Sequence, residues 1–290
     1  MYAITGITGR VGGAAARALL GRGESIRAIA RSTDKGKVWS EKGCDVALAT
    51  IDDSEALTKA FTGADGVFLM TPSNYDPEPG FPQTRKILNA VSAAIKTARP
   101  GRVVFMSTVG AQAKEENLLT NATIMEEGLR ALPVPMALLR PAWFMENSAW
   151  DVAAARSGHL PSYLQPLDHP IPMIATADIG VVVADLLQQT WTGTRIVELE
   201  AARRYSANDI GRAFAETIGR QVQVEAVPRE TWETTFRSQG MKHPMPRMRM
   251  IDGFNEGWID FEGGAAEHST AQTPLEAVIR DLVRAAGPEI

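Results

Sequence analysis

Short apolar runs alternate with amphipathic segments along the first half of the chain. Strands are predicted at residues 2–5, 24–30, 44–50, 66–71, 102–108 and 136–140. Helices are predicted between them, at residues 11–20, 34–42, 54–61, 82–98 and 120–132. This alternation is typical of βαβ units, and strands that are apolar throughout indicate a parallel sheet covered by helices on both faces.

The pattern changes after Pro141. Helices are predicted at 176–189, 206–219 and 273–283, and strands at 195–200 and 221–227. Ser206 is expected to cap the second of these helices, and Thr273 with Glu276 has the spacing of a capping box for the third. The stretch 228–268 is rich in Met, Pro and Arg, and we expect it to cover a cleft.

The loop after the first strand contains three glycines, Gly6, Gly9 and Gly12, in the sequence TGITGRVG. Glycines allow a sharp turn and let backbone amides approach a pyrophosphate closely. The helix that follows points its N-terminal N–H groups at that anion. Because the loop follows a strand and opens a helix, it predicts a dinucleotide site rather than a turn without a ligand.

The end of the second strand indicates which dinucleotide is bound. A bare ribose 2′-hydroxyl favours Asp or Glu there, whereas a guanidinium suits a 2′-phosphate. This chain has Arg31, Ser32 and Lys35 at that place, and Arg10 of the glycine loop can add to the same pocket. We therefore expect NADP(H) to be preferred, with NAD(H) possible. The alternative is that these basic residues only form a solvated face.

Together these patterns predict an α/β protein, a Rossmann-type doubly wound parallel sheet with a smaller C-terminal α/β lobe. Residues 1–150 are assigned to the NAD(P)-binding Rossmann domain, to which segments near 176–200 return. Residues 151–290 are assigned to a substrate or cap lobe. We expect the two parts to be interleaved rather than joined by a flexible tether.

Composition excludes several other classes of protein. The net charge of −4 over 290 residues argues against a nucleic-acid binder. Cys44 is the only cysteine, which fits a reducing cytoplasm. No basic leader and no apolar run of membrane-spanning length is present, so we expect a cytoplasmic protein without a membrane partner. The four histidines lack metal-ligand spacing, and no metal site is expected.

Five segments, TGITGRVG, ARSTDK, GADGVFLMTP, RVVFMSTVGA and LLRPAWFMEN, carry a family resemblance. In order and spacing they resemble the NmrA-like branch of the atypical short-chain dehydrogenases/reductases. Within that branch they are most similar to the NAD(P)H:quinone oxidoreductase-like members. The resemblance is clear over residues 1–200, and its most specific piece is LRPAWFMEN, residues 139–147.

The resemblance implies roles for particular residues, by position. The pyrophosphate would be contacted by Gly6, Thr8, Gly9, Arg10, Val11 and Gly12, and the 2′-phosphate by Arg31. Thr71 and Pro72 would border the adenosine and the nicotinamide ribose. Ser107, Thr108 and Val109 would lie beside the nicotinamide.

The catalytic pair of standard short-chain dehydrogenases is missing. Those enzymes use Tyr-x-x-x-Lys, in which the lysine lowers the pKa of the tyrosine that moves the proton. None of the four tyrosines here has a lysine four residues later, and no lysine lies between Lys114 and Lys242. The predicted helix 120–132 instead carries Glu126, which matches a glutamate common in the family. It is either catalytic or a solvent-facing or structural carboxylate, and the catalytic residues stay unknown.

Two functions are compatible with this sequence. One is an NADP(H)-dependent oxidoreductase that passes hydride to a quinone-like or conjugated carbonyl acceptor needing little help with its proton. The other is a non-catalytic NADP(H)-binding redox sensor that acts through a regulatory protein partner. The oligomeric state, monomer or homodimer, is open.

A few side chains are candidates for contact with the acceptor. Trp143, Phe144 and Trp150 would line a slot, or else form core between sheet and lobe. Asn147 belongs to the same stretch, and Tyr75 lies in the long loop after the fourth strand. The basic run 242–250 is expected to be an exposed helix face rather than a partner site.

Overall fold

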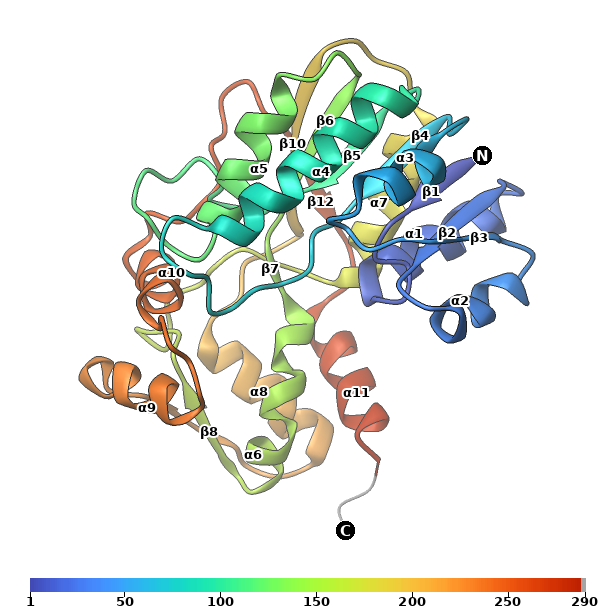
Figure 1. Ribbon diagram of the computed structural model, residues 1–290. Coiled ribbons are helices and arrows are strands. Elements are labelled where there is room, and N and C mark those ends of the chain that lie inside the picture. Colours follow the sequence, from blue (N-terminus) through green and yellow to red (C-terminus); the bar gives the residue numbers. More distant parts are fainter. Residues whose placement is uncertain (288–290) are drawn as a thin grey trace.

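The computed structural model describes residues 1–287 and contains a central sheet of eight parallel strands (Figure 1). The strands are β1 (Tyr2–Ile4), β2 (Ile26–Ala30), β3 (Asp45–Leu48), β4 (Gly66–Leu69), β5 (Val103–Met106), β6 (Met136–Pro141), β10 (Thr194–Ala201) and β12 (Glu267–Ala271). Their order is β12-β10-β6-β5-β4-β1-β2-β3. The part that runs from β3 to β6 is the dinucleotide-binding order, so the predicted fold is confirmed.

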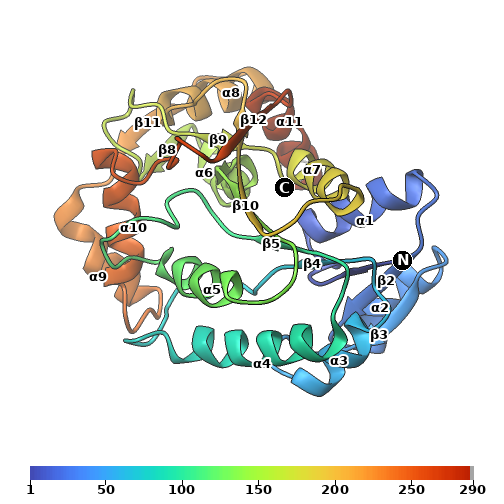
Figure 2. The same cartoon turned by 90° about the horizontal axis from the view of Figure 1, so that it is seen from above.

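Helices cover both faces of this sheet (Figure 2). One face carries α1 (Arg10–Gly21), α2 (Thr33–Ser40) and α7 (Thr176–Gln188), and the other carries α3 (Ser54–Phe61), α4 (Pro82–Ala98) and α5 (Thr120–Arg130). Successive strand residues point to opposite faces. Thus Val67 and Val103 pack with the α3–α5 layer, while Phe68 and Val104 pack with α1 and α7.

The remaining elements form a lobe beside the carboxyl ends of the central strands (Figure 1). The chain enters it after β6 through β7 (Trp143–Phe144) and a 3₁₀ helix, η1 (Met145–Asp151). The other lobe elements are α6 (Val152–Arg156), β8 (His159–Ser162), β9 (Met173–Ile174), α8 (Ala207–Ile218), β11 (Gln223–Ala226), η2 (Arg229–Thr231), α9 (Trp232–Ser238), α10 (Met245–Glu256) and α11 (Leu275–Ala285). Because α7, β10 and β12 belong to the sheet layers, lobe and sheet segments alternate along the chain.

The domain boundary at residue 150 stays a prediction, and residues 288–290 of the assigned lobe lie outside the described part. No helix within residues 1–287 combines the length and the apolar content that crossing a bilayer requires.

Two features differ from the sequence-based expectations. Strand β12 was not expected, and it pairs in parallel with β10 at the sheet edge. The capping box proposed for Thr273 and Glu276 is wrong, whereas the cap at Ser206 is confirmed and forms a capping box with Asp209. The Thr273 hydroxyl donates instead to Asp178 Oδ1 at 2.8 Å, because α7 presents that carboxylate beside it.

The contact between α1 and α7 yields a stability prediction. A Cβ atom on Gly180 of α7 would lie 2.4 Å from the Ala14 Cβ and 2.7 Å from the Ala15 backbone nitrogen. Gly180→Val should therefore push the two helices apart and lower the free energy of unfolding by about 1–3 kcal/mol, measured by urea denaturation. Gly21→Ala is the control, because nothing lies within 4 Å of that position. An unchanged urea midpoint for Gly180→Val would contradict this packing.

Candidate cofactor and acceptor site

The ends of four neighbouring strands bring the predicted cofactor residues to one edge of the sheet. These neighbouring strands are β2, β1, β4 and β5, in their order across the sheet. Strand β2 leads into Arg31, β1 into the glycine loop, β4 into Thr71 and β5 into Ser107. Ile4 of β1 is opposite Ala28 of β2, so the glycine loop and Arg31 leave the sheet at about the same height. With neighbouring strands about 4.8 Å apart, these loops span roughly 15 Å, a row suited to an extended dinucleotide.

The glycine loop has the geometry that a pyrophosphate site needs. Gly6 has φ +60°, and a Cβ on Gly12 would lie 2.4 Å from the Gly6 carbonyl oxygen. The left-handed backbone at Gly6 favours glycine, and at Gly12 any side chain would force the backbone to move. Helix α1 begins at Arg10, with no side-chain cap at Gly9 and no acidic residue in its first turn. Its N-terminal N–H groups are therefore left for an anion.

Arg31, Ser32 and Lys35 are exposed beside this loop. Within residues 1–287, neither Arg31 nor Lys35 forms an ion pair with a carboxylate. Ser32 occupies the N-cap position of α2, but its side chain does not cap the helix. The three side chains are thus available to a phosphate group, and their assignment to the cofactor stays a prediction.

A cavity of about 670 Å³ opens at the carboxyl ends of β4, β5 and β6, between the sheet and the lobe. The sequence-predicted residues that line it are Thr71, Pro72, Tyr75, Ser107, Thr108, Val109, Trp143, Phe144, Asn147 and Trp150. Crevices at this edge of a parallel sheet are where ligands of such folds bind. The structure therefore brings the predicted nicotinamide and acceptor residues together around one space, while the glycine loop and Arg31 lie outside its lining.

The aromatic candidates differ in their surroundings. Trp143 is half-buried and packs edge-on against Phe254 of α10, with ring centroids 5.2 Å apart. Trp150, which also lines the cavity, is 69% exposed and touches the Tyr75 ring edge-on, with centroids 6.1 Å apart. Flat apolar surfaces therefore reach the cavity from two sides.

The lobe supplies cavity residues that the sequence analysis missed, among them Asp151, Tyr163, Arg247 and Met250. The basic run 242–250 was expected to be an exposed helix face, and this expectation is wrong for Arg247. Helix α10 turns that side chain into the cavity, where burial lowers the pKa of its guanidinium. The one sequence signal for Asp151 and Arg247 was that both lie in segments containing aromatic residues or several methionines.

Asp151 is a carboxyl with an altered protonation equilibrium. It stands at the N-cap position of α6, yet it makes no side-chain hydrogen bond to that helix. Burial without a compensating partner raises its pKa to about 7. The cavity lining thus contains a carboxyl group that stays protonated until the pH approaches about 7.

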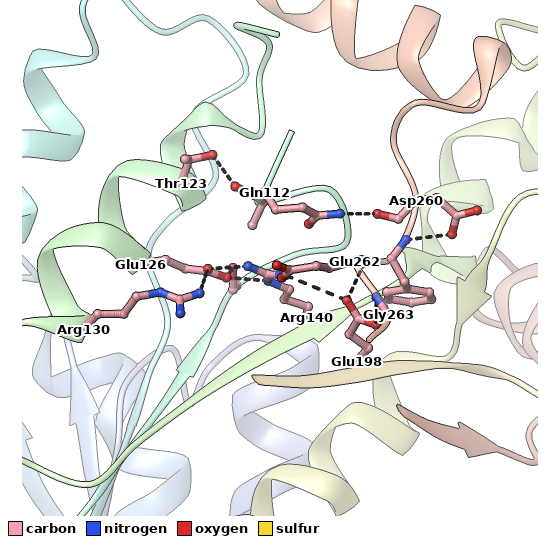
Figure 3. Close-up of polar contacts among 12 residues, drawn as sticks. Gln112, Thr123, Glu126, Arg130, Arg140, Glu198, Asp260, Glu262 and Gly263 are labelled. Atoms are coloured by element: carbon pink, nitrogen blue, oxygen red, sulfur yellow. Dashed lines mark hydrogen bonds and ion pairs between the residues drawn. The ribbon is translucent and has the colours of Figure 1, made fainter. Parts of the chain in front are cut away.

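An ion cluster around the buried Arg140 lies next to the cavity lining (Figure 3). Arg140 at the end of β6 donates to Glu126 Oε1 at 2.8 Å and to Glu126 Oε2 at 2.7 Å. Ser107, which lines the cavity, donates its hydroxyl to Glu126 Oε1 at 2.5 Å. Arg140 also donates to Glu262 Oε2 at 2.6 Å, and its Nη1 lies 3.8 Å from Glu198 Oε1.

This cluster rules out one of the alternatives for Glu126. The residue is 3% exposed and is not part of the cavity lining, so its carboxylate is not solvent-facing. Burial alone would raise its pKa, but the hydrogen bonds from Arg140 and Ser107 outweigh that effect and the pKa is lowered. Glu126 is therefore an ionised carboxylate that links Ser107 to Arg140, an arrangement typical of a structural role, and a catalytic role stays a prediction.

The raised pKa of Asp151 generates a pH prediction. The folded state holds this proton more tightly than the unfolded chain, so stability falls as the pH rises from about 4 through about 7. Asp151→Asn removes the titration, and its stability relative to wild type should rise over that interval by up to about 4 kcal/mol and then level off. Urea denaturation at several pH values measures this, with Asp281→Asn, an exposed carboxyl of α11, as the control. A pH-independent difference would refute the assignment.

Comparison with known proteins agrees with this geometry. The chain is 24% identical to quinone oxidoreductase 2 of Escherichia coli (strain K12) over 270 residues, which cover 92% of this chain and 88% of that protein. The crystal structure of the E. coli NADPH-dependent quinone oxidoreductase QOR2 in complex with NADPH superposes with a TM-score of 0.80, at 22% identity, covering 97% of this chain and 99% of that one. The Citrobacter triphenylmethane reductase gives a TM-score of 0.79 at 19% identity, covering 98% and 99%.

These similar proteins are named as reductases, and one of the similar structures is a complex with NADPH. A family model described as the NmrA-like family matches residues 2–268, nearly the whole chain. The suspected family is therefore confirmed: this protein belongs to the NmrA-like family.

Proposed function

We propose that this protein is an NADPH-dependent reductase of flat, conjugated acceptors, with quinones as the leading class. The observation that carries the proposal is the aromatic-lined cavity at the carboxyl ends of β4, β5 and β6, next to the glycine loop. Its described lining contains no lysine, so it offers no Tyr–Lys pair for proton transfer. Such a site suits an acceptor that needs to be held in place more than it needs acid catalysis.

Each part of NADP(H), from the 2′-phosphate to the nicotinamide, can be assigned to residues of this chain. The phosphates would be held by the glycine loop and the uncapped start of α1, with Arg31, Ser32 and Lys35 at the 2′-phosphate. Thr71, Pro72 and the segment Ser107–Val109 would place the nicotinamide at the inner end of the cavity. NADPH supplies the hydride there when it is bound.

The protein's contribution to the reaction is then mainly positioning. Trp143, Phe144 and Tyr75 would hold the acceptor ring against the nicotinamide, and the Asn147 amide could donate to an acceptor oxygen. Holding two reactants in this way can account for a large part of a rate enhancement. A quinone that takes up hydride becomes a hydroquinone anion, which its own ring stabilises and which water can protonate.

The names of similar proteins support this choice of acceptor. One relative is a quinone oxidoreductase, another is an NAD(P)H azoreductase, and a similar structure is a triphenylmethane reductase. Quinones, azo compounds and triphenylmethane dyes share an extended conjugated system that accepts electrons.

The first experiment follows NADPH absorbance at 340 nm with purified protein and a panel of quinones, enones and azo dyes. We expect saturable turnover with at least one quinone, and slower turnover when NADH replaces NADPH. Binding of NADPH, monitored by its fluorescence, serves as the control for an active preparation. Tight NADPH binding without turnover across the panel would refute the reductase and favour the redox sensor.

The 2′-phosphate assignment has a separate test. Arg31→Glu should weaken NADPH binding about 10- to 100-fold, because it replaces a charge-assisted hydrogen bond by repulsion, while NADH affinity stays the same or rises. Fluorescence titration measures both dissociation constants. Lys96→Glu on α4 makes the same charge change away from the site and should alter neither. Unchanged relative affinities in Arg31→Glu would show that another residue reads the 2′-phosphate.

A further inference from the structure

We propose that the acceptor carries an oxyanion substituent, a carboxylate, sulfonate or phosphate, and that Arg247 binds it at the lobe end of the cavity. This inference rests on the proposed reductase function and specifies its substrate class. It makes Arg247 a specificity-determining residue.

Arg247 lacks the carboxylate partner that comparable arginines have. Arg140 donates to Glu126 and Glu262, at 2.6 to 2.8 Å. Over the same range of distances, Arg204 donates to Asp260 and Arg229 donates to Asp252. Within residues 1–287, no carboxylate oxygen lies within the 4.0 Å ion-pair distance of Arg247. Its contacts are the Met241 sulfur, 3.8 Å from Nη1, and the Phe236 ring, whose centroid is 4.5 Å from the guanidinium carbon.

The missing carboxylate partner affects the pKa of Arg247. Burial lowers the pKa of Arg247, whereas carboxylate partners raise the pKa of Arg140, Arg204 and Arg229. A half-buried cation without a counterion is unfavourable unless something else compensates it. An anion entering the cavity would supply that compensation.

Among the described residues, no charged group around Arg247 supplies this compensation. The titratable groups that face it are the phenols of Tyr163 and Tyr75, and burial raises the pKa of Tyr163 further, which keeps it neutral. Asp76, in the same loop as Tyr75, accepts instead from the backbone N–H groups of Lys242 and His243. Asp151 also lines the cavity, but within residues 1–287 it forms no ion pair with Arg247.

The position of Arg247 points to the acceptor rather than to the cofactor phosphates. Helix α10 lies on the opposite side of the molecule from β1 and β2, where the phosphates are assigned (Figures 1 and 2). A guanidinium offers a planar set of donors that matches the oxygens of carboxylate, sulfonate and phosphate groups. Tyr75 and Tyr163, beside it in the lining, give an aromatic acceptor two rings to pack against.

A matched pair of acceptors tests the proposal: 1,4-naphthoquinone and 1,4-naphthoquinone-2-sulfonate. Arg247→Met removes the charge and keeps an unbranched side chain about as long as the aliphatic part of arginine. We expect it to lower kcat/KM for the sulfonate about 10- to 100-fold and to change the value for the neutral quinone less than about threefold. Arg247→Lys, which keeps the charge, should recover part of the loss. Equal losses on both quinones, or no loss on the sulfonate, would overturn the proposal.

Arg249→Met is the matched control, because Arg249 is on the same helix but pairs with Glu115 outside the cavity lining. It should leave both quinones unaffected. NADPH affinity, measured for every variant, reports whether the fold and the cofactor site are intact.

A binding measurement separates this inference from the proposed function. Calorimetry compares 2-naphthalenesulfonate with 2-naphthol on the NADP⁺-loaded protein, since neither compound can be reduced. Wild type should bind the sulfonate at least tenfold more tightly, and Arg247→Met should lose that preference while Arg249→Met keeps it. This result would support the anion site even if no quinone were turned over, which would refute only the reductase. Equal affinities for the two compounds in wild type would overturn the anion site, whatever the turnover.

Discussion

The buried charge of Arg140 is the constraint on which the architecture of the site depends. At 2% exposure, a guanidinium must be fully paired, because an uncompensated charge in the interior costs several kcal/mol. Glu126 from α5 and Glu262 from the segment before β12 provide the pairing. Glu198 of β10 accepts the N–H groups of Glu262 and Gly263 at 2.7 and 3.1 Å, which fixes that segment against the sheet.

The cavity takes its shape from this pairing. Ser107 is held by Glu126, so the end of β5 cannot move independently of α5 and β6. The lobe closes the other side through α10, whose Phe254 packs against Trp143 at the start of the lobe. One wall is therefore fixed by ion pairs and the other by aromatic packing, and the space between them is where cofactor and acceptor would meet.

Charge is distributed unevenly around that space. Behind the wall, Arg140 is paired with carboxylates, whereas inside it Asp151 and Arg247 have no ionic partner within the described chain. Unpaired polar groups in a cavity cost stability, and they are found where a ligand completes the pairing. This contrast separates the residues that support the site from those available to a ligand.

The sequence by itself determined seven of the eight strands of the sheet, the glycine loop and the place of Arg31, because strand periodicity and glycine spacing act over a few residues. Ser206 formed the expected cap for the same reason, since its partner Asp209 lies within one helical turn. Only the tertiary structure decided that Thr273 does not cap its helix, because its hydroxyl donates to Asp178 of α7 instead. The same holds for the burial of Glu126, whose partner Arg140 lies 14 residues away in the chain. Likewise, only the packing of α10 placed Arg247 in the cavity, because its burial depends on elements that are distant in the chain.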